Sequence, residues 1–178
     1  FASRILRVLE YKARPFEFRI GSNGRTTTAK KLYQLATPMN TTVAQHYQEF
    51  AQGANVYLST GDSAATDIAA ETVDVIVTDP PFFDNVHYSQ LADFFYVWQQ
   101  SILKSSDNQT QVTTRHPDEV QHTDAQVFTQ RLTAVLCECN RVLKHTGLMV
   151  FTYHHTRAEG WEALYHAVRT AGFVITRT

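Results

Sequence analysis

Short β-branched runs alternate along this chain with longer stretches whose apolar residues have helical spacing. The clearest run is Val73–Thr78, which leads directly into Asp79 and two prolines. A run bounded so sharply by proline predicts a buried parallel strand that delivers its last residues to the carboxyl edge of a sheet. Similar but weaker patterns predict further strands at 55–59, 148–153 and 172–176.

Apolar residues at helical spacing predict helices between and beside these strands. The predicted helices cover 5–11, 41–52, 88–103, 128–143 and 159–170. The helix at 88–103 is rich in aromatic residues, so we expect it to pack on the sheet with a largely buried face. A basic turn and Gly147 are expected to stop the helix at 128–143. This order of elements indicates an open α/β sheet with helices on its faces.

Length and composition limit the domain organisation. With 178 residues and 43% hydrophobic content, the chain can bury one sizeable core. We expect an α/β domain over 53–178, preceded by a helical and loop appendage over 1–52. Because the chain begins at Phe1 and ends at Thr178 inside a predicted strand, we expect it to be part of a longer polypeptide.

Charge and cysteine content narrow the class of protein. A total of 16 Lys and Arg against 17 Asp and Glu gives no overall basic field, so DNA binding would need a local patch or a part outside this chain. Cys137 and Cys139 have neither disulfide nor zinc spacing, and no metal site is expected. No apolar run approaches the roughly 20 residues of a membrane span, and no signal peptide opens the chain. We therefore expect a cytoplasmic protein with no membrane partner.

The sequence Asp79-Pro80-Pro81-Phe82 suits the activation of an aromatic exocyclic amine. The lone pair of such an amine is delocalised into the ring, so a catalyst must hold both hydrogens and favour a tetrahedral nitrogen. The Asp79 carboxylate and the Pro80 carbonyl could accept these hydrogens, since consecutive prolines restrict the backbone and donate no N–H. Phe82 could then stack on the base. The alternative is a rigid turn in which Asp79 only caps the backbone.

Two neighbouring segments are candidate binding sites. Asp62 and Ser63 follow the predicted strand at 55–59, where a carboxylate could bind the edge of an adenine. The alternative there is a Gly-Asp turn that caps a helix. Phe83, Asn85 and His87 could line a pocket for a target base, and the Asn85 amide is best suited to pair with a base edge. A plain turn that caps the next helix is the alternative for this loop.

Around these motifs the chain resembles a known family. The sequence TDPPFFDNVHY at 78–88, continued by LADFFYVW at 91–98, is similar to the amino-methyltransferases of DNA modification. The likeness is greatest to adenine-specific DNA methylases of bacteria and archaea, some of which carry a zinc ribbon. It extends more loosely to 141–147, 150–155 and 161–164, covering 54–178 well and the first fifty residues poorly.

The resemblance implies a partial Rossmann-like methyltransferase sheet with helices on both faces. It implies methyl transfer from S-adenosylmethionine to adenine N6 of a flipped base in DNA, with Asp79, Pro80, Pro81 and Phe82 at the target amine. Asp62, Ser63 and Asp79 would lie near the cofactor. N4-cytosine methylation meets the same chemical problem and stays open, as does a non-catalytic nucleic-acid-binding or assembly module of the same fold.

Two departures from the family pattern are informative. Phe82 stands where tyrosine is commoner, so stacking is retained and a phenolic hydrogen bond is absent. The Phe-x-Gly-x-Gly loop that binds the methionine part of the cofactor is missing, and none of the 7 glycines lies in that arrangement. We therefore expect half an active site here, which alone could be inactive, with the cofactor loop in the remainder of a larger methylase. The sequence does not indicate the DNA recognition sequence, the oligomeric state or the biological role.

Overall fold

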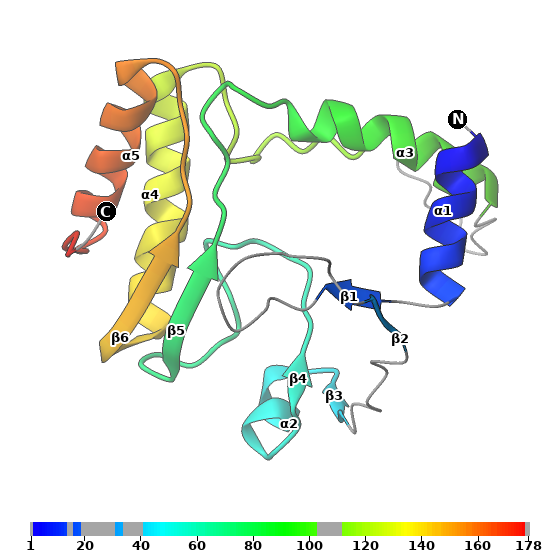
Figure 1. The fold of residues 1–178 in the computed structure, drawn as a ribbon. Helices are drawn as coiled ribbons and strands as arrows, with labels where there is room; N and C mark the ends of the chain where they lie inside the picture. The colour runs from blue at the N-terminus through cyan, green and yellow to red at the C-terminus, as the bar shows by residue number, and fades with distance from the viewer. Residues whose placement is uncertain (1, 14–15, 19–30, 34–40, 103–111, 177–178) are drawn as a thin grey trace, which may run out of the picture. The chain divides into compact units, whose positions relative to one another are not determined.

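A computed structural model describes residues 2–13, 16–18, 31–33, 41–102 and 112–176 of the 178-residue chain. The chain divides into two compact units, Phe1–Leu58 and Ser59–Thr178. Helices and short strands occur in both units, so the protein is mixed α/β (Figure 1). Its described strands form three two-stranded sheets, two of which are parallel.

The described residues of the first unit form one longer helix, one short helix and four short strands. Their bounds are α1 Ala2–Ala13, β1 Phe16–Phe18, β2 Lys31–Tyr33, β3 Val43–Ala44, α2 Tyr47–Ala51 and β4 Val56–Tyr57. Strands β1 and β2 pair antiparallel, whereas β3 and β4 pair parallel. The helix predicted at 41–52 is wrong over its first half. The Thr42 carbonyl accepts hydrogen bonds from the N–H groups of Asn55 and Val56, which draws this segment into a strand.

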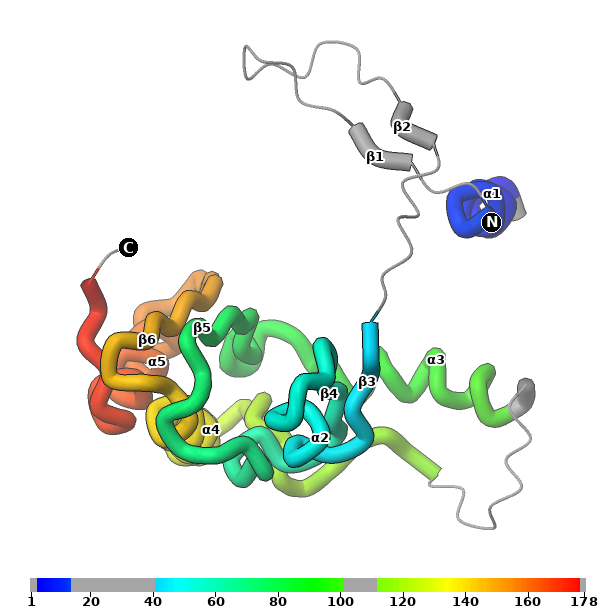
Figure 2. The backbone as a smooth tube through the Cα atoms, turned by 90° about the horizontal axis from the view of Figure 1, so that it is seen from below, coloured from blue at the N-terminus to red at the C-terminus, as the bar shows by residue number. Residues whose placement is uncertain are grey.

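In the second unit, the part that the structure describes contains three helices and two strands. Their bounds are β5 Val73–Thr78, α3 Tyr88–Ile102, α4 Ala125–Val142, β6 Leu143–Phe151 and α5 Ala158–Thr170. Strand β5 pairs parallel with β6, with Val75 opposite Leu148 and Thr78 opposite Phe151. The two strands lie side by side in both Figure 1 and Figure 2. The parallel strand predicted at Val73–Thr78 is therefore confirmed.

Helices α4 and α5 pack together and form the core of the second unit. Phe128, Leu132 and Leu136 recur every four residues along α4 and are almost fully buried. Facing positions of α5 are small, including Ala163 and Ala167, which allows the helices to approach closely. Each fully buried Leu or Phe contributes about 1.5–3 kcal/mol, so this helix pair is a main source of stability.

Helix α4 begins and ends at well-defined positions. The Asp124 carboxylate accepts hydrogen bonds from the N–H groups of Gln126 and Val127, as an N-cap does. The end predicted at Gly147 is wrong, because the chain turns extended at Leu143 and continues directly into β6. Leu143 pairs with Val73, so the strand starts earlier than its apolar run suggests.

The strand predicted at 172–176 is also wrong. Gly172 has a φ of 87° and ends α5, and the Phe173 N–H donates to the Val168 carbonyl. These backbone groups satisfy the last turn of the helix, as in a Schellman-like cap, and residues 173–176 have no regular structure. The segment therefore caps α5 and adds no strand to the sheet.

Within the second unit, the described helices α4 and α5 pack on one face of the β5–β6 sheet. The other face presents Val75, Val77, Leu148 and Val150 to solvent, with Val77 76% exposed. The expectation of a fully buried strand with helices on both faces is therefore wrong for the described residues. The described strands form two-stranded sheets, so the α/β class is shown and a partial Rossmann-like sheet is not.

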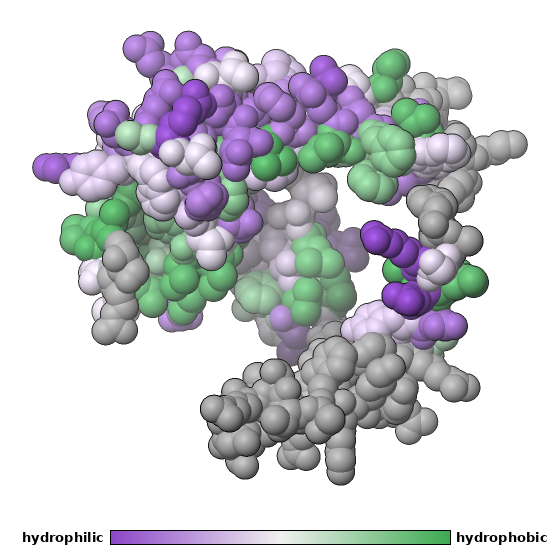
Figure 3. All heavy atoms as spheres, turned by 45° about the horizontal axis from the view of Figure 1, so that its top comes forward, coloured by the Kyte–Doolittle hydropathy of each residue, from purple (hydrophilic) through white to green (hydrophobic). Residues whose placement is uncertain are grey.

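Helix α3 differs from its prediction in burial and not in position. It spans the predicted residues, yet its apolar side chains are exposed. These residues are Leu91, Phe94, Phe95, Val97 and Trp98, which are between 58% and 64% exposed. Because these side chains are exposed, the expected packing of this face on the sheet is wrong. Figure 3 shows apolar side chains, in green, among the exposed groups.

Candidate functional site

Asp79 and Thr152 lie side by side where the two parallel strands end. Thr78 at the end of β5 is opposite Phe151 at the end of β6, so the next residues of each strand are neighbours. The Thr152 N–H donates to the Thr78 carbonyl at 3.3 Å, which extends the ladder by one step. The Thr152 hydroxyl donates a hydrogen bond to Asp79 Oδ1. Asp79 thus stands at the carboxyl edge of the sheet with one oxygen held.

Side-chain alternation decides which side of the sheet Asp79 occupies. Successive side chains of a strand point to opposite faces. Val75, Val77 and Asp79 therefore share a side, and Leu148, Val150 and Thr152 share it too. Because Val77 and Val150 are exposed, this side is the face that no described helix covers. The carboxylate is exposed there, at the end of an apolar surface.

The residue after the prolines is held by an aromatic pair. The rings of Phe82 and Tyr153 meet edge to face with centroids 5.4 Å apart, and Tyr153 meets Trp161 in the same way at 5.2 Å. The Tyr153 hydroxyl donates to the Gly160 carbonyl at 3.0 Å. Burial, reinforced by the nearby negative charge of Asp84, raises the pKa of Tyr153 to about 12. Tyr153 therefore stays neutral and supports Phe82 as a fixed, mainly apolar wall.

Phe83 anchors the loop in the core. Its side chain is 1% exposed and contacts the rings of Phe128 and His155, with centroids 5.3 and 5.6 Å away. The guanidinium of Arg157 lies 5.5 Å from the centre of the Phe83 ring. Phe83 has a φ of 54°, in the left-handed region that is strained for a bulky residue. Its packing compensates for this strain, and a ring so buried faces no ligand.

Asp84 joins the loop to the segment between β6 and α5. Its Oδ1 lies 2.5 Å from Arg157 Nη2 and 3.4 Å from Nε2 of the buried His155. The hydrogen bond from the Arg157 guanidinium, with a smaller contribution from His155, lowers the pKa of Asp84. His155 is further enclosed by Gly160, at which an added Cβ would lie 2.4 Å from the imidazole Cγ. The contacts of Asp84 with Arg157 and His155 therefore fix the C-terminal end of the loop after β5.

The last predicted residues of the loop, Asn85 and His87, are exposed and lie immediately before α3. The Asn85 N–H donates to the Phe82 carbonyl at 3.0 Å, which closes a turn. The His87 carbonyl accepts from the Leu91 N–H at 3.2 Å, and its Nδ1 lies 3.3 Å from Gln121 Nε2. The Asn85 side chain is exposed, so it is accessible to a ligand.

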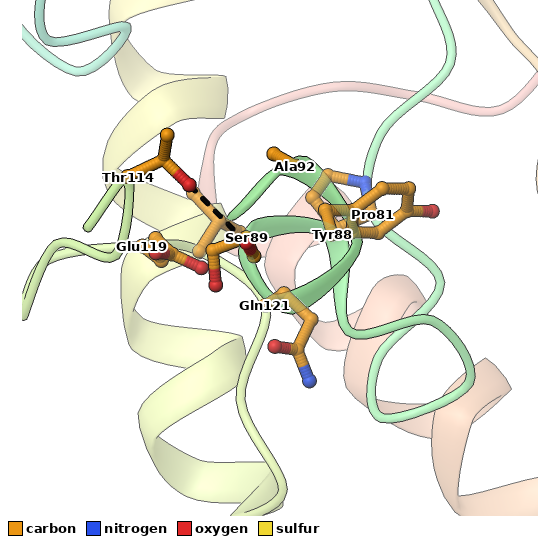
Figure 4. A pocket seen from close by; sticks show the side chains of 8 residues that line it. Pro81, Tyr88, Ser89, Ala92, Thr114, Glu119 and Gln121 are labelled. Atoms are coloured by element: carbon orange, nitrogen blue, oxygen red, sulfur yellow. Dashed lines mark hydrogen bonds between the residues drawn. The ribbon is translucent and has the colours of Figure 1, made fainter. Parts of the chain in front are cut away.

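A shallow cavity of about 290 Å³ lies on the other side of the prolines (Figure 4). It is lined by Pro81, Tyr88, Ser89, Ala92, Thr114, Glu119, Val120 and Gln121. The Thr114 hydroxyl donates to the Ser89 carbonyl at 3.2 Å, which connects 112–123 to α3. Of the predicted catalytic residues, only Pro81 lines this cavity. The cavity is therefore separate from the Asp79 carboxylate.

The segment predicted to bind a cofactor forms a tight turn. Asp62 Oδ1 accepts from the Ala64 N–H at 2.8 Å, and the Asp62 carbonyl accepts from the Ala65 N–H at 3.1 Å. Asp62 and Ser63 are exposed. A Cβ added at Gly61 would meet no atom within 4 Å, so no close backbone approach requires glycine there. This turn supplies one accessible carboxylate, that of Asp62, which by itself is too little to hold a whole S-adenosylmethionine molecule.

Sequence reasoning missed Thr152, Tyr153 and Arg157, which together hold the loop. The nearest signal was the end of the predicted strand at 148–153, which is followed by His154 and His155. Of this pair His155 is buried against the loop, whereas His154 is exposed. Alignment of the two predicted strand ends could have suggested Thr152, because parallel strands end at the same edge.

Comparisons with protein-family models, with curated proteins and with solved structures found no match to this chain. The described residues contain no group of three or more His, Cys, Asp or Glu side chains able to hold a metal ion. No helix in the described ranges is both long and apolar enough to cross a membrane.

Proposed function

We propose that this chain forms the target-amine part of an S-adenosylmethionine-dependent DNA adenine N6-methyltransferase. The observation that carries the proposal is the Asp79 carboxylate, exposed at the carboxyl edge of two parallel strands with Oδ1 held by Thr152. No described residue hydrogen-bonds to Oδ2, so this oxygen is available to an amine. The likeness of 78–98 to DNA amino-methyltransferases supports the same assignment.

The chemistry of this part of the site follows from its acceptors. Asp79 Oδ2 and the Pro80 carbonyl accept the two hydrogens of an adenine N6 amine and draw its lone pair out of the ring. Phe82, fixed by Tyr153, stacks on the base. S-adenosylmethionine would supply an electrophilic methyl group to the nitrogen. Its binding site needs residues beyond the carboxylate of Asp62, consistent with the missing glycine-rich loop.

The test is analysis of the nucleosides formed when the full-length protein acts on DNA with S-adenosylmethionine. We expect N6-methyladenine, and we expect Asp79→Asn to reduce its rate by about 100-fold or more, as loss of a positioned acceptor does. Asp74→Asn is the matched control, because Asp74 is exposed on the same strand and pairs with Lys144. Asp74→Asn should retain full activity.

Three outcomes would change the assignment. N4-methylcytosine as the product would move the substrate from adenine to cytosine and keep the role of Asp79. Full activity in Asp79→Asn would remove Asp79 from the mechanism. No methylated base, together with no heat of binding for S-adenosylhomocysteine, would favour a non-catalytic nucleic-acid-binding or assembly module.

A further inference from the structure

We propose that Thr152 is a positioning residue that orients the Asp79 carboxylate for the target amine. The inference rests on the proposed function and adds a residue that the sequence did not single out. Its basis is the hydrogen bond from the Thr152 hydroxyl to Asp79 Oδ1, which joins residues far apart in the chain.

The backbone of Thr152 is fixed by the sheet. Its N–H donates to the Thr78 carbonyl, immediately after the last paired residues of β5 and β6. A threonine side chain is stiff at χ1, because two heavy atoms on Cβ limit its rotamers. The hydroxyl therefore points in a set direction relative to the strand that carries Asp79.

Asp79 itself has little else to hold it. Its side chain is exposed, and the Thr152 hydroxyl is its one hydrogen-bond partner among the described residues. An exposed carboxylate without this contact would sample several rotamers. Because Oδ1 is engaged by Thr152, Oδ2 is left as the oxygen that faces a substrate. Thr152 thus acts through Asp79 and need not touch the base.

Tyr153, the residue after Thr152, supports another part of the loop that follows β5. Tyr153 meets Phe82 edge to face, so consecutive residues after β6 hold the acceptor and the stacking ring. Thr152 and Tyr153 together therefore fix the position of Asp79 relative to Phe82, which follows it after the two prolines. This arrangement makes the end of β6 the support of the whole Asp79–Phe82 loop.

The experiment compares Thr152→Val, Thr152→Ser and wild type in the full-length protein. Valine keeps the shape and removes the hydroxyl, whereas serine restores it. We expect Thr152→Val to lower kcat by about 10- to 100-fold, since misplacement of a catalytic group by about 1 Å can have such an effect. KM for DNA should change less than about twofold, and Thr152→Ser should recover most of kcat. Thr146→Val, at an exposed threonine of the same strand, is the matched control.

The outcomes separate this inference from the function on which it rests. An active wild type with Thr152→Val equal to it in kcat would overturn the role of Thr152 and leave the function standing. A rise in KM alone, or no recovery in Thr152→Ser, would also overturn it, because positioning requires the hydroxyl. An inactive wild type would overturn the proposed function, and the role of Thr152 with it. A thermal melting curve for each variant checks that the loss is not unfolding.

Discussion

Arg157 donates a hydrogen bond to Asp84, with 2.5 Å between Nη2 and Oδ1, and so ties the loop after β5 to the start of α5. This contact, the Thr152–Asp79 bond and the buried Phe83 ring hold the loop at both ends and in its middle. The loop is therefore rigid where its chemistry would occur. Its strained residue at Phe83 is compensated by packing against α4.

Replacement of Phe82 tests whether its ring acts by stacking. We expect Phe82→Ala to lower kcat/KM for DNA methylation by about 5- to 100-fold, because base–aromatic stacking contributes about 1–3 kcal/mol. Phe82→Tyr should retain most activity, since the ring remains and tyrosine is the commoner residue in the family that this segment resembles. Steady-state kinetics on a DNA duplex measures both variants. Equal losses in Phe82→Ala and Phe82→Tyr would contradict stacking as the role of Phe82.

Gly160 and His155 form a close contact that a single methyl group would disrupt. An added Cβ at Gly160 would lie 2.4 Å from His155 Cγ, which is shorter than a van der Waals contact and therefore a clash. We expect Gly160→Ala to lower the free energy of unfolding by about 1–3 kcal/mol, because overpacking outweighs the better helix propensity of alanine. Urea denaturation measures this change. Gly61→Ala, at a position with open space, should have little effect.

A double variant tests the cause of that loss. If the clash with His155 is responsible, removing the imidazole makes room for the new methyl group. The loss in His155→Ala/Gly160→Ala should then be smaller than the sum of the two single losses by about 0.5 kcal/mol or more. Strict additivity would show that Gly160 matters for another reason.

Glu138 provides a pH-dependent contribution to stability. Its carboxylate accepts hydrogen bonds from the Thr66 hydroxyl at 2.6 Å and from Arg141 Nη2 at 2.6 Å. Arg141 first, and then Thr66, lower the pKa of Glu138 from 4.5 to about 2. A carboxyl whose pKa is lower in the folded state stabilises the fold above its unfolded pKa. This stabilisation is lost as the pH falls from about 4.5 to about 2.

The expected result for Glu138→Gln follows from the lowered pKa of Glu138 in the folded state. At pH 7 the variant should be less stable by about 1.5–3 kcal/mol, the usual contribution of hydrogen bonds to a charged group. The difference should shrink steadily below pH 4.5 and be mostly lost at pH 2, where about half of the wild-type carboxyl is protonated. Urea denaturation at a series of pH values measures it, with Glu162→Gln on the exposed side of α5 as control. A difference that is constant from pH 7 to pH 2 would contradict this account.

Several features follow from local sequence alone. The β-branched run and its two prolines predicted the strand at Val73–Thr78 and the place of Asp79 at its end, because proline cannot continue a parallel ladder. Four-residue spacing of Phe128, Leu132 and Leu136 predicted α4, since one buried stripe is the simplest way for a helix to join a core. Such signals are carried by residues close together in the chain.

Other features needed long-range contacts. The α3 aromatics have the pattern of core residues in the sequence, yet they are exposed in the structure. The end of α4 at Val142 depended on the pairing of Leu143 with Val73, and it overrode the helix stop expected at Gly147. In both cases the tertiary structure outweighed the local pattern.

The sequence by itself determined that an acid, two prolines and an aromatic ring follow a strand, and hence which groups are available for amine chemistry. Only the tertiary structure decided what holds them: Thr152 beside Asp79, Tyr153 beside Phe82, and Arg157 beside Asp84. The physical reason is that two parallel strands are joined by a long connection, so residues far apart in the chain become neighbours only once the strands pair. No local pattern near Asp79 specifies which residue of β6 becomes its neighbour.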